Sequence, residues 1–368
     1  MIAAAYSKWS QDEVAVTALA GSAALVLGGQ TLHSLFGMDT RPLSRGAWLR
    51  IILQRHAVFA GDPLQAAPVR VTDTSVDRMV FDCAMWRATF EGEGGVVHCL
   101  TGCHRQSRDS DFQDILDRVR WGRADRSVVD RINATWTAAF DGLVTKLRIK
   151  KSAALDINTG QLATIEAPEH RFMAQDVIVQ ESSGLVDDPY AMLRTLVDLT
   201  LSLKLTAAVV LTRKLQGLPA GTRGTVTDIV VKNIVDDDGT RSVKVVSCDF
   251  GGCVVCVEPM RFSAYDSRGV EVAFCMQLPL LLGWAITVHR SHGMTLDAVE
   301  IDFDVDTWST SGLIYTALSR VRSFSALRVR GLRPDLIRVS RCAVAYFERQ
   351  LRENNVDPSD DGRPGVET

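Results

Sequence analysis

The residues best suited to phosphate chemistry lie in the last third of the chain, after a long apolar stretch. Leu278–Val288 is an almost continuous apolar run, and it ends in the polar segment His289–Gly293. Such a run is typical of a buried parallel strand that leads into a loop. In open α/β sheets, ligands bind just beyond the carboxyl ends of such strands. The sequence therefore predicts a ligand-binding loop at His289–Gly293.

A second polar segment follows, and it predicts a helix that carries an arginine. Tyr315, Leu318 and Val321 are spaced three residues apart and so share one helical face, with Arg320 beside that face. A strand end followed by such a helix predicts a phosphate site into which Arg320 reaches.

These two segments resemble motifs V and VI of the petite-integration-frequency (Pif-type) DNA helicases, which are RecD-like members of superfamily 1. Trp284–Asp297 is similar to the family pattern W-A-I-T-I-H-K-S-Q-G-x-T-L-D, and Tyr315–Val321 is similar to Y-V-A-L-S-R-V. Arg290 stands where the family has lysine, so the positive charge is kept with a different geometry. His292 replaces a glutamine. The chain is identified by these matches as a member of that family.

Two further segments resemble the family's phosphate-sensing motifs III and IV. Val58–Val69 holds Gly-Asp at the end of an apolar strand with Gln65 downstream, similar to G-D-x-x-Q-L-P-P-V, and Arg105 lies in an x-R-Q pattern. The resemblance implies that Gln65, Arg105 and Arg320 are catalytic. It also implies a set of nucleotide-binding residues, namely Asp62, Gln65, Arg105, Gly293 and Arg320.

The resemblance also implies contacts with single-stranded DNA. Val14–Ala24 and Gly28–Ser34 are similar to motif Ia, V-A-V-T-A-x-T-G-x-A-A followed by G-G-x-T-x-H-S. The implied DNA-binding residues come from motifs Ia and V: Thr31, His33, His289, Arg290, Ser291 and His292. A purely structural alternative remains, in which His33 closes a core edge and the motif V histidines are loop residues bonded to the backbone.

Two motifs that hold MgATP in the family have no counterpart in this sequence. No Gly-Lys-Ser or Gly-Lys-Thr occurs, although the family uses this loop to hold the β- and γ-phosphates. The segment between Met38 and Ala57 has no Asp-Glu pair, which in the family holds Mg²⁺. ATP and Mg²⁺ are thus the implied cofactors, but their usual ligands are missing, and we expect no ATP hydrolysis by the chain as written. No metal-binding residue is predicted.

The elements that would position these residues predict an α/β fold. The resemblance implies two RecA-like parallel-sheet domains, the first one incomplete, with a small SH3-like β-barrel inserted in the second. Short strands from Leu203 onward and a turn at Asp237–Thr240 agree with a barrel. The expected parts are an incomplete first domain (1–96), the first part of the second domain (97–202), the barrel (203–274), the rest of the second domain (275–352) and a disordered tail (353–368).

Two amphipathic helices are also predicted. Asp111–Gly122 carries apolar residues at helical spacing and ends at a glycine, and Val339–Leu351 forms the closing helix. The arginines in and after the first of these helices are interpreted as a solvated face: Arg118, Arg120, Arg123 and Arg126.

Composition limits the partners. The formal net charge is −3, so no global basic field attracts nucleic acid and a DNA-binding surface must be a local groove. The longest apolar run is too short to span a bilayer, which excludes a membrane span of that kind. Eight irregularly placed cysteines favour reduced thiols. Two cysteine-bearing groups could suggest zinc, but a turn and barrel-core thiols are the favoured interpretations: His98, Cys99, Cys103 and His104 in one group, and Cys248, Cys253 and Cys256 in the other.

Taken together, the resemblance implies an ATP-dependent 5′-to-3′ DNA helicase acting in replication, recombination, repair or telomere maintenance. Its partner would be single-stranded or forked DNA, with no membrane partner, and it would act as a monomer in the nucleus or the mitochondrion. One hypothesis is that the coding sequence of this helicase is incompletely represented here. The alternatives are a DNA-binding paralogue that has lost hydrolysis and, least favoured, a small zinc-binding module.

Overall fold

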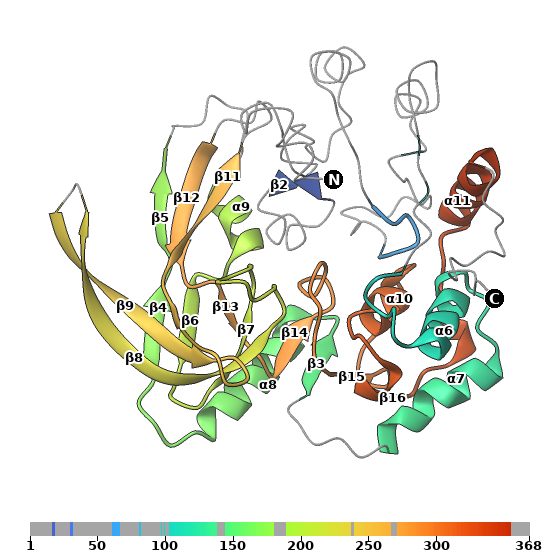
Figure 1. Ribbon diagram of the computed structural model, residues 1–368, viewed down its shortest axis with the longest axis horizontal. Coiled ribbons are helices and arrows are strands. Elements are labelled where there is room, and N and C mark those ends of the chain that lie inside the picture. The colour runs from blue at the N-terminus through green and yellow to red at the C-terminus, as the bar shows by residue number, and fades with distance from the viewer. Residues whose placement is uncertain are drawn as a thin grey trace, which may run out of the picture. The chain divides into compact units, whose positions relative to one another are not determined.

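The computed structural model describes residues 17–18, 30–31, 61–66, 81, 97, 99, 103–137, 144–179, 189–236, 239–265 and 271–354. The chain divides into two compact units (Figure 1). The first unit comprises Met1–Pro42 and Leu143–Asp297, and the second comprises Leu43–Gly142 and Ala298–Thr368. The five-part domain division predicted from the sequence stays a prediction.

The largest sheet of the first unit is antiparallel and has the strand order β10-β9-β8-β7-β13. Its strands are β7 (Ala208–Leu211), β8 (Arg223–Asp236), β9 (Gly239–Asp249), β10 (Val254–Val257) and β13 (Leu280–Leu282). Alternate residues of these strands face one core that includes Val209, Val246 and Val257, all fully buried. Asp236 pairs with Gly239 across the β8–β9 pair, which confirms the hairpin predicted around these residues.

Two smaller antiparallel sheets complete this side of the first unit. One has the order β11-β12-β5, formed by β5 (Gln175–Ile178), β11 (Met260–Tyr265) and β12 (Glu271–Gln277). Helix α9 (Pro189–Leu196) packs against β11 and β12 through Leu193, which is fully buried. The other pairs β4 (His170–Met173) with β6 (Thr200–Leu203).

The parallel part of the first unit begins where the long apolar run changes sheet. β14 (Ala285–Thr287) pairs in parallel with β3 (Thr145–Arg148), and α8 (Lys151–Ala163) packs against both. The sequence predicted one strand over Leu278–Val288, which is wrong: the run forms β13 and β14 in two sheets. Gly283 lies between them, and a Cβ there would be 3.1 Å from the backbone of Val209. The chain can turn at this position because glycine has no side chain to place. The short strands β1 (Thr17–Ala18) and β2 (Gln30–Thr31) also pair in parallel.

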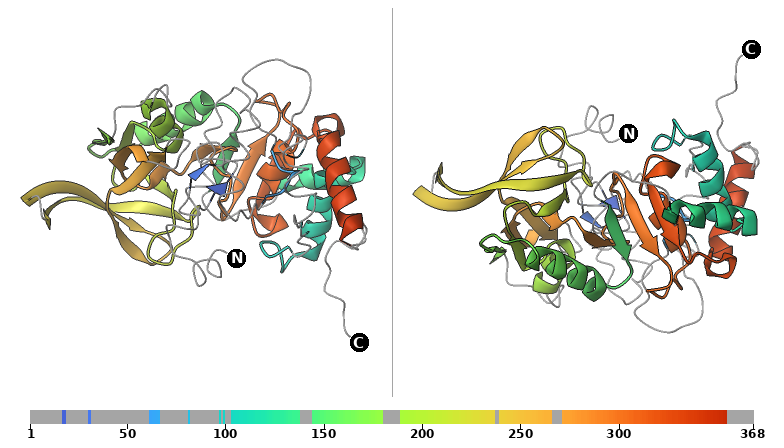
Figure 2. Two further views of the ribbon diagram at one scale, coloured as in Figure 1. Left: turned by 90° about the horizontal axis from the view of Figure 1, so that it is seen from above. Right: turned by 90° about the horizontal axis from the view of Figure 1, so that it is seen from below.

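The second unit contains a parallel strand pair and a group of helices. β15 (Val299–Asp302) pairs with β16 (Leu327–Arg330). The helices are α6 (Ser110–Arg120), α7 (Arg126–Asn133), η2 (Ala134–Thr137), α10 (Leu313–Leu318), η3 (Phe324–Ala326), η4 (Pro334–Leu336) and α11 (Arg341–Glu353). Helix α11 lies near the end of α6 (Figures 1 and 2), where the ring centroids of Trp121, the residue after α6, and Phe347 are 5.7 Å apart.

The helix predictions for the second unit are mostly confirmed. α6 begins after Asp109, whose carboxylate accepts from the backbone N–H of Phe112 at 3.0 Å, and Gly122 follows its end with φ +67°. The predicted helix around Tyr315 is shorter than expected, because α10 ends at Leu318. Arg320 therefore lies in the turn after the helix. None of the described helices is long and apolar enough to cross a membrane.

Candidate functional site: an arginine cluster and a polar loop

Two arginines of the second unit donate hydrogen bonds to Ser319, one to its backbone carbonyl and the other to its hydroxyl. Arg105 donates from Nη1 to the carbonyl of Ser319 at 2.8 Å. Arg320 donates from Nη2 to the Ser319 hydroxyl at 2.8 Å and from Nε to the carbonyl of Thr316 at 2.7 Å. Gln106 donates to the carbonyls of Ser319 (3.3 Å) and Val321 (2.6 Å). We call Arg105, Gln106, Ser319 and Arg320 the arginine cluster.

Burial makes this cluster electrostatically unusual. Arg320 is only 2% exposed. Burial and the nearby charge of Arg105 lower the pKa of Arg320 to about 9, and burial also lowers the pKa of Arg105. The two guanidinium groups are both positively charged and shielded from water, so they repel one another. An anion between or beside them would be stabilised. The cluster is therefore suited to bind a phosphoryl group.

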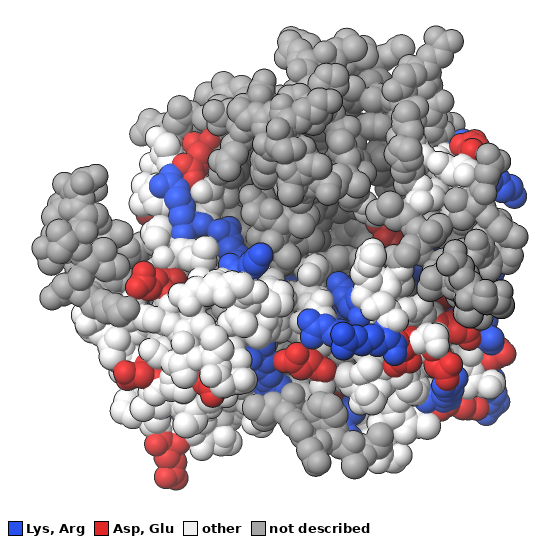
Figure 3. All heavy atoms as spheres, viewed as in Figure 1, with Lys and Arg blue, Asp and Glu red and all other residues white. Residues whose placement is uncertain are grey.

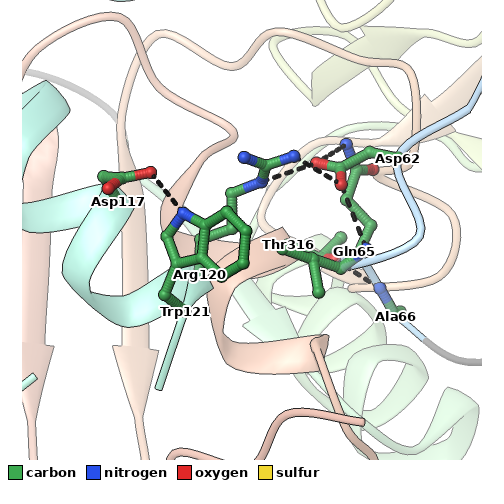
Figure 4. Close-up of polar contacts among 8 residues, drawn as sticks. Asp62, Gln65, Ala66, Asp117, Arg120, Trp121 and Thr316 are labelled. Carbon is green, nitrogen blue, oxygen red and sulfur yellow. Dashed lines mark hydrogen bonds and ion pairs between the residues drawn. The ribbon is translucent and has the colours of Figure 1, made fainter. Parts of the chain in front are cut away.

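The segment Gly61–Ala66 is fixed against α10, on the same unit (Figure 4). The backbone N–H of Ala66 donates to the Thr316 hydroxyl at 2.9 Å. Gly312, with φ +72°, lies so close that a Cβ there would be 2.2 Å from the carbonyl oxygen of Gln65. Gln65 is thus positioned by close contacts of its own backbone and of the next residue with α10 and Gly312.

Asp62 anchors the same segment and is itself held by Arg120 (Figure 4). Its carboxylate accepts from Arg120 Nη2 at 2.9 Å and Nε at 3.2 Å, from the backbone N–H of Leu64 at 3.0 Å and from Gln65 Nε2 at 3.4 Å. The carboxylate therefore fixes the turn that presents Gln65. Its predicted contact with nucleotide stays a prediction.

The structure thus brings four predicted residues into one unit: Asp62, Gln65, Arg105 and Arg320. The charge of Asp62 is close enough to act on Arg320 and on Tyr315. Gly293 lies in the first unit, with the polar loop.

Sequence reasoning missed three residues of this site. Gln106 was seen only as part of a pattern, and Thr316 only as part of a helix. Arg120 was interpreted as a solvated arginine, which is wrong, because its side chain is 19% exposed and bonded to Asp62. No local signal marks Arg120, since its partner lies 58 residues away in the sequence.

The polar loop His289–Gly293 follows β14 in the first unit, as predicted for a loop after a strand end. Ser291 is fully buried, and its hydroxyl donates to the carbonyl of Val288 at 2.7 Å. Gly293 has φ +77°, a conformation that favours glycine. Burial lowers the pKa of His289. Hydrogen bonds between the loop and the residues next to it in the sequence therefore hold its conformation.

Arg290 of this loop makes an internal ion pair. It donates to both carboxylate oxygens of Asp198, at 2.6 and 2.9 Å. The DNA contacts predicted for His289, Arg290, Ser291 and His292 stay predictions. Thr31 lies in β2, where it pairs with Ala18 of β1.

The remaining predicted site residue, His33, lies outside the described residues. On the face shown in Figure 3, the described Lys and Arg side chains lie among Asp and Glu side chains, without one broad basic field.

The cysteines and histidines of the described residues form no group of three or more that could hold a metal ion. Cys248 is buried, as predicted for a core thiol, and burial raises its pKa to about 12. Cys253 is exposed and Cys256 is half-buried, so these two thiols are not core residues of the same kind.

The chain is similar to known helicases in sequence and in fold. No family model matches it. It is 29% identical over 399 residues to the ATP-dependent DNA helicase PIF1 of Homo sapiens, a match that covers 94% of this chain and 58% of the human protein. The chain spans about half the length of the curated relatives it matches, such as 45% of the Xenopus laevis protein of the same name.

The fold is similar to that of the Pif1 helicase from Candida albicans, with a TM-score of 0.68 and 21% identity over 95% of this chain and 91% of that one. It is also similar to Bacteroides sp Pif1 in complex with ADP-AlF4, with a TM-score of 0.61 and 20% identity over 96% of this chain and 90% of that one. For Bacteroides Pif1 bound to ssDNA the TM-score is 0.58, with 21% identity over 93% of this chain and 88% of that one.

These likenesses agree with the α/β class and the RecA-like architecture that the motifs predicted. The sequence match extends over most of the chain. The similarity to the PIF1 proteins in sequence and to the Pif1 helicases in fold supports the Pif1-type helicase family that the motifs predicted.

Proposed function

We propose that this chain is part of an ATP-dependent DNA helicase that moves 5′ to 3′ on single-stranded or forked DNA. The observation that carries the proposal is the arginine cluster, in which Arg105 and Arg320 converge on Ser319 in a buried setting. Catalysis of phosphoryl transfer consists mainly of positioning and charge stabilisation, and paired arginines supply the latter.

The residues of the second unit fit the terminal phosphate of a nucleotide. Arg105 and Arg320 would donate hydrogen bonds to its non-bridging oxygens and offset the charge that develops there. Gln65, fixed by Asp62 and by the backbone contact with Gly312, would orient a water molecule or report the presence of the phosphate. ATP supplies the phosphoryl group and the free energy of its hydrolysis.

The rest of a MgATP site has no such fit in this sequence. The chain contains no Gly-Lys-Ser or Gly-Lys-Thr loop, and no Asp-Glu pair lies between Met38 and Ala57. We therefore assign no step to Mg²⁺ and expect no hydrolysis by the chain as written. The expected role in replication, recombination, repair or telomere maintenance, in the nucleus or the mitochondrion, rests on the family alone.

A second candidate function is DNA binding by a paralogue that has lost hydrolysis. The lack of an Asp-Glu pair between Met38 and Ala57 favours it, since that pair holds Mg²⁺ in working members of the family. The complexes of Bacteroides Pif1 with ADP-AlF4 and with ssDNA support nucleotide and DNA as ligands of the family but do not separate the two candidates.

Sequencing the transcript upstream of Met1 and across the Met38–Ala57 junction separates them. We expect a longer message that encodes a Gly-Lys-Ser/Thr loop and an Asp-Glu pair. Its product should release phosphate from ATP when single-stranded DNA is added and should unwind a duplex with a 5′ tail but not one with a 3′ tail. The chain as written should bind DNA without turnover.

Three other outcomes count against the proposal. Transcripts without the loop, with DNA binding retained, would establish the paralogue instead. Unwinding from a 3′ tail would refute the direction. If the protein encoded by the longest transcript neither binds single-stranded DNA nor hydrolyses ATP, both candidate functions are overturned.

A further inference from the structure

The polar loop is joined by a bidentate ion pair to a carboxylate that lies 92 residues earlier in the sequence. Arg290 donates from Nη1 to Oδ2 of Asp198 at 2.6 Å and from Nη2 to Oδ1 at 2.9 Å. Lys151 reaches the same carboxylate, with Nζ 2.7 Å from Oδ1. Two parallel hydrogen bonds between guanidinium and carboxylate fix the position and the orientation of both groups. We call Lys151, Asp198 and Arg290 the Asp198 clamp.

The clamp is unlike an exposed surface pair. The side chains of Arg290 and Asp198 are 22% and 30% exposed, whereas that of Lys151 is 65% exposed. Apolar residues, including Leu201, Leu280 and Met294, line a pocket beside the pair and reduce its access to water. Burial acts to raise the pKa of Asp198, but the hydrogen bonds and charges of Arg290 and Lys151 outweigh it and lower the value to about 2. The carboxylate is therefore charged at neutral pH.

The backbone of Asp198 is held by a hydrogen bond from a buried side chain. It lies between α9 and β6, and its carbonyl accepts from Gln277 Nε2 at 3.4 Å. Gln277 is buried and also donates to the carbonyl of Phe172 at 3.1 Å. A group anchored in this way can hold a loop, because it cannot follow the loop's motion.

At the other end, Arg290 belongs to a tight turn. Its backbone N–H donates to the Thr287 hydroxyl at 3.3 Å, and the N–H of Ser291 donates to the Thr287 carbonyl at 3.1 Å. The N–H of Met294 donates to the carbonyl of Ser291 at 3.0 Å. The side chain of Arg290 thus connects a turn that leaves β14 to a residue 92 positions earlier in the chain.

We propose that Asp198 is a positioning residue for DNA binding, which holds Arg290 inside the fold and thereby sets the shape of the loop His289–Gly293. Single-stranded DNA is then bound by other groups of the loop and its surroundings, because the guanidinium of Arg290 is paired with Asp198 and does not contact DNA. The inference rests on the proposed binding of DNA and replaces the predicted phosphate contact of Arg290.

The alternative, in which Arg290 contacts a DNA phosphate, predicts the opposite effect of neutralising Asp198. In that case Asp198 competes with the phosphate for Arg290, and Asp198→Asn frees the arginine and removes a negative charge near the DNA. Affinity should then rise. If Asp198 positions the loop, the same substitution should weaken binding, although it makes the protein less negative.

The test is the affinity of the full chain for a fluorescently labelled oligothymidine, measured by anisotropy over a series of KCl concentrations. We expect Asp198→Asn to weaken binding about tenfold, a size typical of groups that orient a ligand-binding residue. Arg290→Gln should weaken binding similarly without changing the slope of log K against log salt. Loss of one phosphate contact would reduce that slope by about 0.7.

A matched control and a double variant sharpen this test. Asp156→Asn removes the same charge from an exposed position on α8, the helix that begins with Lys151, and should leave affinity unchanged or slightly higher. The double variant Asp198→Asn/Arg290→Gln should bind no worse than either single variant, because the two residues act as one unit.

Hydrogen exchange separates failure of the clamp from failure of DNA binding. Without DNA, Asp198→Asn should speed exchange of the amides of 289–294 and leave the β8–β9 hairpin unchanged. If the unsubstituted chain does not bind oligothymidine, the proposed function fails, and exchange alone decides the clamp. Tighter binding by Asp198→Asn, a reduced salt slope for Arg290→Gln, or unchanged exchange in the loop would overturn the inference.

Discussion

Arg120 donates two hydrogen bonds to the carboxylate of Asp62, from Nη2 at 2.9 Å and from Nε at 3.2 Å, although 58 residues separate them. The guanidinium of Arg120 also lies 4.8 Å from the ring centroid of Phe347 on α11. One side chain of α6 therefore links the segment that presents Gln65 to a helix near the end of the chain. The link makes the place of Gln65 depend on the packing of the whole second unit.

Replacement of Arg120 by methionine should destabilise the second unit by about 2–4 kcal/mol, because it leaves the Asp62 carboxylate, only 18% exposed, without its ion-pair partner. Denaturant unfolding monitored by tryptophan fluorescence measures this. Arg131→Met is the matched control, since its pair with Asp111 is exposed (52% and 76%) and should contribute about 0–1 kcal/mol. If both substitutions lower the free energy of unfolding equally, the ion pair with Asp62 contributes no more than an exposed pair.

The close approach at Gly312 gives a second test of how Gln65 is held. Gly312→Ala places a methyl group 2.2 Å from the Gln65 carbonyl oxygen at φ +72°, and we expect a loss of about 2 kcal/mol or more from strain and displacement. Gly160→Ala in α8 is the control. A Cβ there meets nothing within 4 Å, so the substitution should stabilise the protein by about 0.5–1 kcal/mol. A Gly312→Ala variant as stable as the unsubstituted chain would contradict the close contact.

The helix that carries Arg120 could be predicted because its signals are local. The apolar spacing of α6 and the glycine that follows it, Gly122, concern residues near one another in the sequence. The role of Arg120 could not be predicted, since an arginine on an amphipathic helix is ordinarily solvated and its partner Asp62 is distant. Hydrophobic periodicity indicates which face of a helix is buried, but not which residues elsewhere in the chain contact that helix.

The polar loop shows the same division between local and distant information. Its place after a strand was predicted from the change from apolar to polar residues at His289. The break at Gly283 was not, because a continuous apolar run indicates a buried segment without indicating where one strand ends and the next begins. The partner of Arg290 was also missed, since Asp198 lies 92 residues earlier and has no motif of its own.

The arginine cluster should bind simple oxyanions. Sulfate should raise the melting temperature of the chain relative to chloride at equal ionic strength, because an anion that binds only the folded state stabilises it by mass action. Arg105→Gln should abolish most of this increment, whereas Arg105→Lys, which keeps a charge without the planar fork, should retain part of it. The measurement is differential scanning fluorimetry. The same increment in all three proteins would exclude a specific site at Arg105 and Arg320.

His289 should make stability depend on pH in the acidic range. Burial lowers its pKa in the folded protein below the ordinary value of 6.5, so the unfolded chain binds a proton more readily. Stability should be unaffected by this group above pH 6.5 and should fall as pH decreases through 6.5 toward the folded value. His289→Gln should flatten this part of the profile, measured by denaturant unfolding at several pH values. His104→Gln, at an exposed position, should leave it unchanged. A profile that keeps its slope in His289→Gln would assign the effect to another group.

Arg223 at the start of β8 should cost the protein stability. Its three guanidinium nitrogens are buried, and none has a hydrogen-bond partner in the described part of the chain. Burial lowers the pKa of Arg223 to about 10, which the charge of Asp297 only partly opposes. Removing a desolvated charge by Arg223→Met should therefore stabilise the chain by about 1–3 kcal/mol. Arg126→Met, whose side chain is 89% exposed, should change stability by less than about 0.5 kcal/mol in denaturant unfolding. If Arg223→Met instead destabilises the chain, Asp297 and the folded β8 must hold the guanidinium more favourably than its burial indicates. A gain in stability together with weaker binding of oligothymidine would mean that the buried charge is kept for DNA.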